Sequence, residues 1–95
     1  MITVVINCPG VSSLQYEEAC RLANVSPSNP PAGLVFHCGS PTEDGWLVVD
    51  VWESEEAFKK FGERLMPAVK EAGIDAHPMI YRTHQVMGSA IPVTA

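Results

Sequence analysis

One stretch constrains the fold more than any other: residues 45–58, GWLVVDVWESEEAF, in which a strand pattern gives way directly to a helix pattern. The run from Trp46 to Trp52 is rich in β-branched and aromatic residues, as buried strands are. Ser54 then suits a helix N-cap, and the glutamates after it suit the positive end of a helix dipole. The strand also contains Asp50, and a carboxylate buried at that position would need a polar partner.

Turn and cap signals predict the remaining elements. We predict strands at residues 2–8, 33–39, 46–52 and 79–87, and helices from the Ser12-x-x-Gln15 capping box to about residue 24 and over 54–73, the second with a kink or restart at Pro67. The proline-rich residues 25–32 form a loop, and residues 40–45 turn a hairpin. The order β-α-β-β-α-β is the ferredoxin-like α+β pattern, with both helices on one face of a four-stranded antiparallel sheet.

Alternation along the hairpin sorts its residues onto two faces. If Val35 pairs with Asp50, one face is wholly apolar, whereas a one-residue slip mixes polar and apolar positions on both faces. The apolar face then carries Leu34, Phe36, Cys38, Leu47, Val49 and Val51, and the mixed face carries Val35, His37, Trp46, Val48, Asp50 and Trp52. On this register His37 is the diagonal neighbour of Asp50, about 7–8 Å away between Cα atoms. We assign Asn7 of the first strand to the same mixed face.

The chain of 95 residues predicts a single domain, residues 1–88, followed by a tail, residues 89–95. A core of this size leaves much surface exposed, and the strands are apolar on both faces. We therefore expect a homodimer, in which a second subunit covers the sheet face that the helices leave open.

Charge and cysteine usage narrow the partners. The net charge is −5, with six Lys and Arg residues and no basic run, so no nucleic-acid partner is expected. No segment approaches the roughly 18 apolar residues that span a bilayer, and no signal sequence is evident at the start, so no membrane association is expected. The cysteines, Cys8, Cys20 and Cys38, are odd in number and lack C-x-x-C spacing. We interpret them as reduced core residues, which favours a cytoplasmic location.

Several stretches together resemble a known family. The element order, the segment VVDVWESEEAFKKF, the later RLMP and His84 are similar to the dimeric α+β barrel superfamily, in particular the antibiotic biosynthesis monooxygenase (ABM)-like proteins. The resemblance implies a homodimer with a pocket between sheet and helices in each subunit. Some members are cofactor-free monooxygenases of polycyclic aromatic polyketides, some degrade haem, some are cyclases and many have no known activity. Asn7 and Trp52 match positions of the haem-degrading branch, but residues 54–73 lack its axial histidine, so haem degradation is disfavoured.

A candidate site follows from the mixed face and the resemblance. His37 and Asp50 are the candidate catalytic pair, because a carboxylate that fixes the imidazole tautomer suits deprotonation of a phenol or hydroquinone. Arg82 or an indole N–H are the other candidate partners of Asp50. The residues expected to line a substrate site for a small aromatic ligand, beside a pocket at Trp52, are Asn7, Trp46, Trp52 and His84.

Other functional sites lack support in the sequence. There is no G-x-G-x-x-G or Walker loop, no H-x-x-x-H pair and no G-x-S-x-G elbow, so no cofactor and no metal are expected. Each candidate residue also has a structural interpretation, His37 as a satisfied core histidine and the tryptophans as core. The leading hypothesis is a cofactor-independent monooxygenase of a small aromatic or polyketide-like substrate, and the alternative is a non-catalytic dimeric binding or accessory protein.

Overall fold

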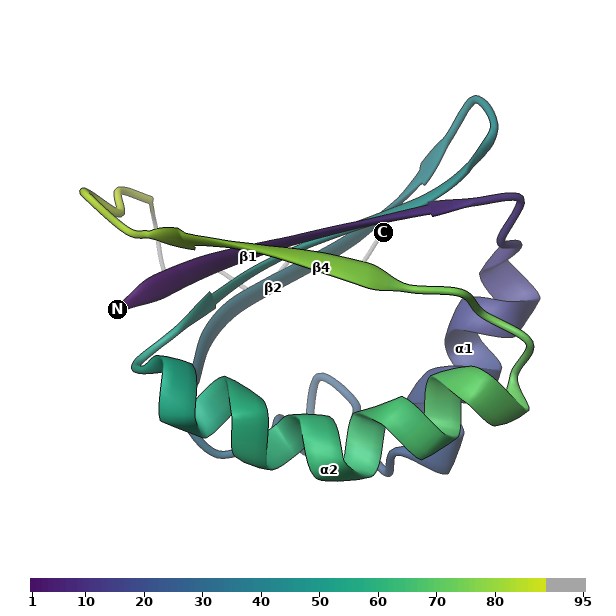
Figure 1. Ribbon diagram of the computed structural model, residues 1–95, viewed down its shortest axis with the longest axis horizontal. Helices are drawn as coiled ribbons and strands as arrows, with labels where there is room; N and C mark the ends of the chain where they lie inside the picture. The colour runs from purple at the N-terminus through teal and green to yellow at the C-terminus, as the bar shows by residue number, and fades with distance from the viewer. Residues whose placement is uncertain (89–95) are drawn as a thin grey trace.

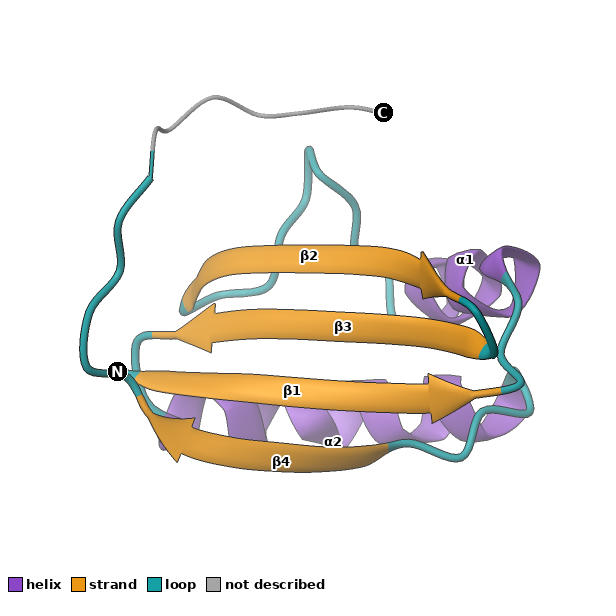
Figure 2. Ribbon diagram, turned by 90° about the horizontal axis from the view of Figure 1, so that it is seen from above, coloured by secondary structure: helices purple, strands orange, loops and turns teal. Residues whose placement is uncertain are grey.

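The computed structural model describes residues 1–88 and has the predicted β-α-β-β-α-β order (Figure 1). The elements are β1 (Ile2–Pro9), α1 (Ser13–Leu22), β2 (Leu34–Thr42), β3 (Gly45–Trp52), α2 (Glu55–Glu71) and β4 (His77–Arg82). All strands pair antiparallel in the order β2-β3-β1-β4, and both helices lie behind one face of the sheet (Figure 2). The ferredoxin-like α+β prediction is confirmed. The predicted tail, residues 89–95, lies outside the described residues.

The face that the helices cover is the one that bears the tryptophans. Val4 pairs with Asp50 on one side and with Ile80 on the other, which fixes the face of every strand residue around them. The side chains on the covered face of β1 and β3 are Ile2, Val4, Ile6, Cys8, Trp46, Val48, Asp50 and Trp52. Val4 and Trp52 are the most deeply buried large side chains of the core. The sequence left open which face meets the helices, and the register with β1 decides it.

The helix ends follow the local signals. Ser12 caps α1 with the predicted capping box, and the helix ends earlier than predicted because Asn24 adopts a left-handed conformation with φ of 57°. Ser54 caps α2 through the N–H of Ala57, and Gly73 ends it with φ of 77°. Both glycine and asparagine tolerate this backbone region, where a Cβ clash penalises most residues.

The helix α2 continues through Pro67 from Glu55 to Glu71, so it does not restart there. Proline removes the N–H that would bind the carbonyl of Glu63. Both residues are exposed, so solvent can satisfy that carbonyl. No helix within residues 1–88 is long and apolar enough to cross a membrane.

The hairpin register and the last strand differ from the prediction. β2 extends to Thr42, which pairs with Gly45, and this shifts the pairing by two residues, so that His37 lies directly opposite Asp50. A bulge between Leu34 and Phe36 also moves Leu34 to the core side, opposite Trp52. β4 ends at Arg82 rather than near residue 87, and it begins at His77, since an edge strand tolerates the proline that follows.

Candidate functional site

Four side chains form one hydrogen-bonded chain between α1 and the sheet. Tyr16 Oη lies 2.5 Å from His37 Nε2, and His37 Nδ1 lies 2.6 Å from Asp50 Oδ1. The indole Nε1–H of Trp52 donates to the other carboxylate oxygen, Asp50 Oδ2, over 3.2 Å. Two of the three partners expected for Asp50, a histidine and an indole, are therefore found.

The donor and acceptor roles follow from the carboxylate. An ionised carboxylate can only accept, so Nδ1 of His37 carries the proton that it donates to Asp50. In the neutral ring Nε2 is then an acceptor, and the hydroxyl of Tyr16 donates to it. The chain thus holds one histidine tautomer, with Nε2 as the basic nitrogen.

The four hydrogen-bonded side chains differ in how deeply they are buried. The side chain of Asp50 is 8% exposed, whereas that of His37 is 35% exposed, because β2 is an edge strand of the sheet. The carboxylate is thus enclosed by its hydrogen-bond donors, and the imidazole connects it to the sheet edge.

Tyr16 is held by its neighbours on the sheet. Its ring stacks on Trp46 with 4.7 Å between centroids. A Cβ atom on Gly39 would lie 2.8 Å from Tyr16 Oη, so the absence of a side chain at Gly39 makes room for the hydroxyl. Burial raises the pKa of Tyr16 above the ordinary phenol value, and the neighbouring Cys20 and Asp50 raise it further. The phenol therefore remains a proton donor at neutral pH.

One buried polar atom next to Tyr16 lacks a hydrogen-bond partner. Among residues 1–88, the indole Nε1 of Trp46 is the one buried side-chain nitrogen or oxygen without a hydrogen bond. A buried donor without a partner costs about 1–3 kcal/mol. This N–H lies beside Tyr16 and Gly39, where an acceptor of a bound molecule could satisfy it.

Comparison with known proteins gives structural neighbours alone. No protein-family model matches the sequence, and no curated protein matches it. A proposed antibiotic biosynthesis monooxygenase from Deinococcus radiodurans superposes with a TM-score of 0.64 at 13% identity, over 94% of this chain and 98% of its own. A mutant of SnoaB, a cofactor-independent oxygenase from Streptomyces nogalater, gives 0.63 at 12% identity, over 93% and 97% of the two chains.

A third neighbour carries a ligand. The monooxygenase from the gene ActVA-Orf6 of Streptomyces coelicolor, in complex with nanaomycin D, has a TM-score of 0.62 at 14% identity, over 94% of this chain and 92% of its own. The chain has the same fold as these three proteins. The likeness extends over almost the whole of each chain, and at these identities it concerns the fold.

Two predicted site residues lie away from the chain of hydrogen bonds. Asn7 pairs with Leu47 and lies exposed on the open face of the sheet, so its assignment to the mixed face was wrong. The alternation within β1 was right, but nothing in the sequence linked the faces of β1 and β3. His84 follows the end of β4 and is exposed. Among residues 1–88 no hydrogen bond joins it to Tyr16, His37, Asp50 or Trp52.

Trp52, beside which a pocket was expected, lines neither of the two pockets described below. Trp52 is 1% exposed, and its ring packs on Phe58 and Phe61 at centroid distances of 5.6 and 5.4 Å. Two open pockets instead flank α2, of about 530 Å³ next to Glu55 and about 630 Å³ next to Met66. In the same residues no three His, Cys, Asp or Glu side chains are grouped as a metal site.

Tyr16 is the site residue that the sequence reasoning missed. Tyr16, Cys20 and Ala23 recur at i, i+4 and i+7 and form an apolar face of the first helix. A tyrosine on a buried helix face usually finds a hydrogen-bond partner for its hydroxyl, so that position was a usable signal. Pairing it with His37 required the packing of α1 on the sheet, which no local pattern specifies.

Proposed function

We propose that this chain is a cofactor-independent monooxygenase of the ABM type that acts on a small hydroxylated aromatic molecule. The observation that carries the proposal is the hydrogen bond of Tyr16 to His37, since Nε2 already binds a phenol hydroxyl at 2.5 Å. A phenolic substrate presents the same group. SnoaB, with the same fold, is described as a cofactor-independent oxygenase.

In this mechanism the substrate enters at the exposed edge of β2 and its hydroxyl replaces that of Tyr16 at Nε2. His37 then accepts the phenol proton, and the carboxylate of Asp50 stabilises the imidazolium through Nδ1–H. Trp52 holds Asp50 in position from the core side. The resulting phenolate can pass an electron to dioxygen, so that the substrate itself supplies the reducing equivalents.

The unpaired indole of Trp46 supports a bound molecule at this place. A carbonyl or second hydroxyl oxygen of the substrate would accept from Nε1–H and remove the cost of the unpaired donor. Movement of Tyr16 would also expose the face of Trp46 on which it now stacks. A flat aromatic ring could take that stacking position.

The proposal includes a homodimer formed by the open sheet face. This face exposes Phe36, Met79 and Tyr81 to about half of their surface. Contiguous apolar surface of this kind usually marks an interface. A second copy would cover it and leave the edge of β2 near His37 as the entrance.

Turnover assays of two active-site variants test the proposal. Oxygen consumption would be measured with anthrone and with 1,4-dihydroxynaphthalene, each corrected for autoxidation. We expect His37→Ala and Asp50→Asn to lower the enzymatic rate at least 100-fold while circular dichroism and native mass remain those of the wild type. His77→Ala is the matched control, because His77 is an exposed histidine on β4 that pairs with Asp75 at 3.1 Å.

The second candidate is a non-catalytic dimeric binding or accessory protein, in which the hydrogen-bonded chain only fixes α1 to the sheet. The complete burial of Trp52 favours it, because no ring-sized space adjoins that indole. In that case the wild type consumes no oxygen beyond autoxidation with any phenol tested. His37→Ala and Asp50→Asn would then lower the thermal midpoint and change nothing else.

A further inference from the structure

The inner face of β4 is less covered than the inner faces of the central strands β1 and β3. Ile80 pairs with Val4, so both side chains point towards the helices. Val4 is completely buried, whereas Ile80 remains 41% exposed. Although α2 runs behind this part of the sheet (Figure 2), an open space separates it from the strand at Ile80.

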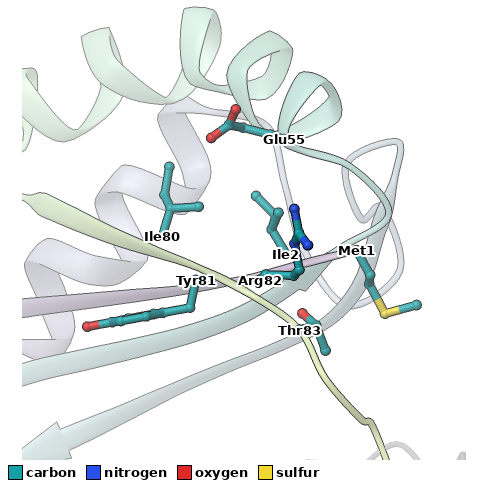
Figure 3. A pocket seen from close by; sticks show the side chains of 7 residues that line it. All are labelled: Met1, Ile2, Glu55, Ile80, Tyr81, Arg82 and Thr83. Carbon is teal, nitrogen blue, oxygen red and sulfur yellow. The ribbon is translucent and has the colours of Figure 1, made fainter.

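That space is the pocket of about 530 Å³ at the start of β1 and the end of β4 (Figure 3). Ligand sites in proteins typically measure about 300–1,000 Å³, so it is large enough for one or two rings. Ile2 and Ile80 give it an apolar side on the sheet, and Glu55 lies on the helix side. The complete lining is Met1, Ile2, Glu55, Ile80, Tyr81, Arg82 and Thr83.

Arg82 gives the pocket its charge. Its side chain extends from the strand towards α2 and lies beside Ile2 (Figure 3). Among residues 1–88 no carboxylate lies within ion-pair distance of it, although acidic residues outnumber basic ones in the chain by 11 to 6. Glu55 is paired with Lys59 at 3.5 Å, and it opens α2, so the pocket also lies at the positive end of that helix.

We propose that this pocket binds a small molecule with an apolar ring and one carboxylate group, which the guanidinium of Arg82 holds. The planar guanidinium matches a carboxylate with two parallel hydrogen bonds. The ring would cover Ile2 and Ile80, and so bury the inward-facing apolar surface that the helices leave exposed. Such a ligand satisfies both features of the pocket at once.

This site is separate from the one proposed for oxygenation. His37 is on β2 and Arg82 is on β4, the two opposite edges of the sheet. Three strand spacings of about 4.8 Å place them about 14 Å apart across the sheet. Ligand binding at Arg82 and turnover at His37 can therefore be tested independently of each other.

Calorimetry with a matched pair of ligands tests the proposal. Full-length protein would be titrated with 2-naphthoate and with 2-naphthamide, which keeps the ring and removes the charge. We expect measurable binding of 2-naphthoate and an affinity at least 10-fold lower for the amide. Arg82→Gln should remove this preference, and Arg21→Gln, which removes the same charge from the exposed surface of α1, should retain it.

Amide chemical shifts locate the ligand. With 2-naphthoate they should change at Ile2, Glu55 and residues 80–83 in the wild type, and equally in the His37→Ala variant. Changes confined to Tyr16 and His37, equal affinities for the two ligands, or unchanged binding by Arg82→Gln would each overturn the proposal. So would the absence of binding at millimolar ligand, the result expected if a second copy of the chain or its own C-terminal residues occupy the pocket.

Discussion

Tyr16 and Asp50 bind opposite nitrogens of one imidazole, Tyr16 Oη at Nε2 and Asp50 Oδ1 at Nδ1 of His37. The first bond joins α1 to the edge strand, and the second joins the edge strand to its neighbour. A buried carboxylate that keeps all its donors costs little, whereas loss of one donor leaves it poorly compensated. The same chain can therefore stabilise the fold and hold a base ready at the sheet edge.

Asp50→Asn should change the tautomer of His37. Asparagine can still accept from Trp52 with its oxygen, but its NH₂ group then faces Nδ1 and favours the tautomer protonated at Nε2. Long-range ¹H–¹⁵N correlation spectra distinguish the two forms, and we expect the wild type to be protonated at Nδ1 when neutral. The free energy of unfolding should fall by about 1–2 kcal/mol. An identical tautomer in both proteins would contradict the donor assignment along the chain.

Tyr16→Phe should alter the alkaline stability profile. The pKa of Tyr16 is raised in the folded state above the ordinary value of 10.0, chiefly by burial, so the unfolded state loses this proton at lower pH. The contribution of Tyr16 is therefore fully present below pH 10 and declines as pH rises towards the folded-state pKa, by at most about 1.4 kcal/mol per pH unit.

Urea unfolding at several values between pH 8 and pH 11 checks this slope. We expect the wild type to lose stability faster than Tyr16→Phe above pH 10, so that the two curves converge. At pH 8 the variant should be about 1 kcal/mol less stable, because it lacks the bond to His37. Parallel curves over the whole range would mean that the phenol is not buried as described.

The order of the elements was predictable because its signals are local. The Ser12 capping box, Gly73 after α2 and the alternation along β3 each depend on a few adjacent residues. The hairpin register was predicted wrongly, because the loop between the two strands was taken to span residues 40–45. Pairing of Thr42 with Gly45 shortens that loop to two residues and moves the partners of residues 36–39 by two positions.

The candidate site was predictable only within the hairpin. Alternation placed His37 and Asp50 on one face, and a shift of two residues preserves the face while bringing the pair closer. The sheet face of Asn7 was predicted wrongly, because it depends on the pairing of β1 with β3, two strands that are distant in sequence. Tyr16 was missed for the same reason, since its partner lies on another element.

Gly39→Ala should disconnect Tyr16 from His37 and leave His37 bound to Asp50. The added methyl would lie 2.8 Å from Tyr16 Oη and 2.9 Å from its Cζ, which forces the phenol ring to move. Overpacking of this kind usually costs about 1–3 kcal/mol. If a substrate hydroxyl takes the position of the Tyr16 hydroxyl, the same methyl obstructs it, so this variant should bind phenolic ligands more weakly than the wild type per folded molecule.

The control for this variant is Gly62→Ala, because Gly62 lies within α2 and a Cβ there has no neighbour within 4 Å. Alanine inside a helix should raise stability by about 1 kcal/mol relative to glycine. Phenol affinity would be measured by fluorescence titration of the two tryptophans. Equal or tighter phenol binding by Gly39→Ala, with Gly62→Ala unchanged, would indicate that the ligand hydroxyl does not take the position of the Tyr16 hydroxyl.

Cys38 reports whether a second copy covers the open sheet face. It pairs with Val49 on that face and is exposed in the single chain, whereas Cys8 is buried, and burial raises the pKa of Cys8. If the homodimer forms, a thiol reagent should label Cys38 slowly at high protein concentration and faster on dilution.

Met79→Glu should give fast labelling of Cys38 and a monomeric native mass, because Met79 lies on the same face. Met66→Glu, on α2 and similarly exposed, should behave as the wild type. Fast labelling of the wild type at every concentration, with a monomeric mass, would contradict the dimer and require the apolar surface at Phe36 to be explained in another way.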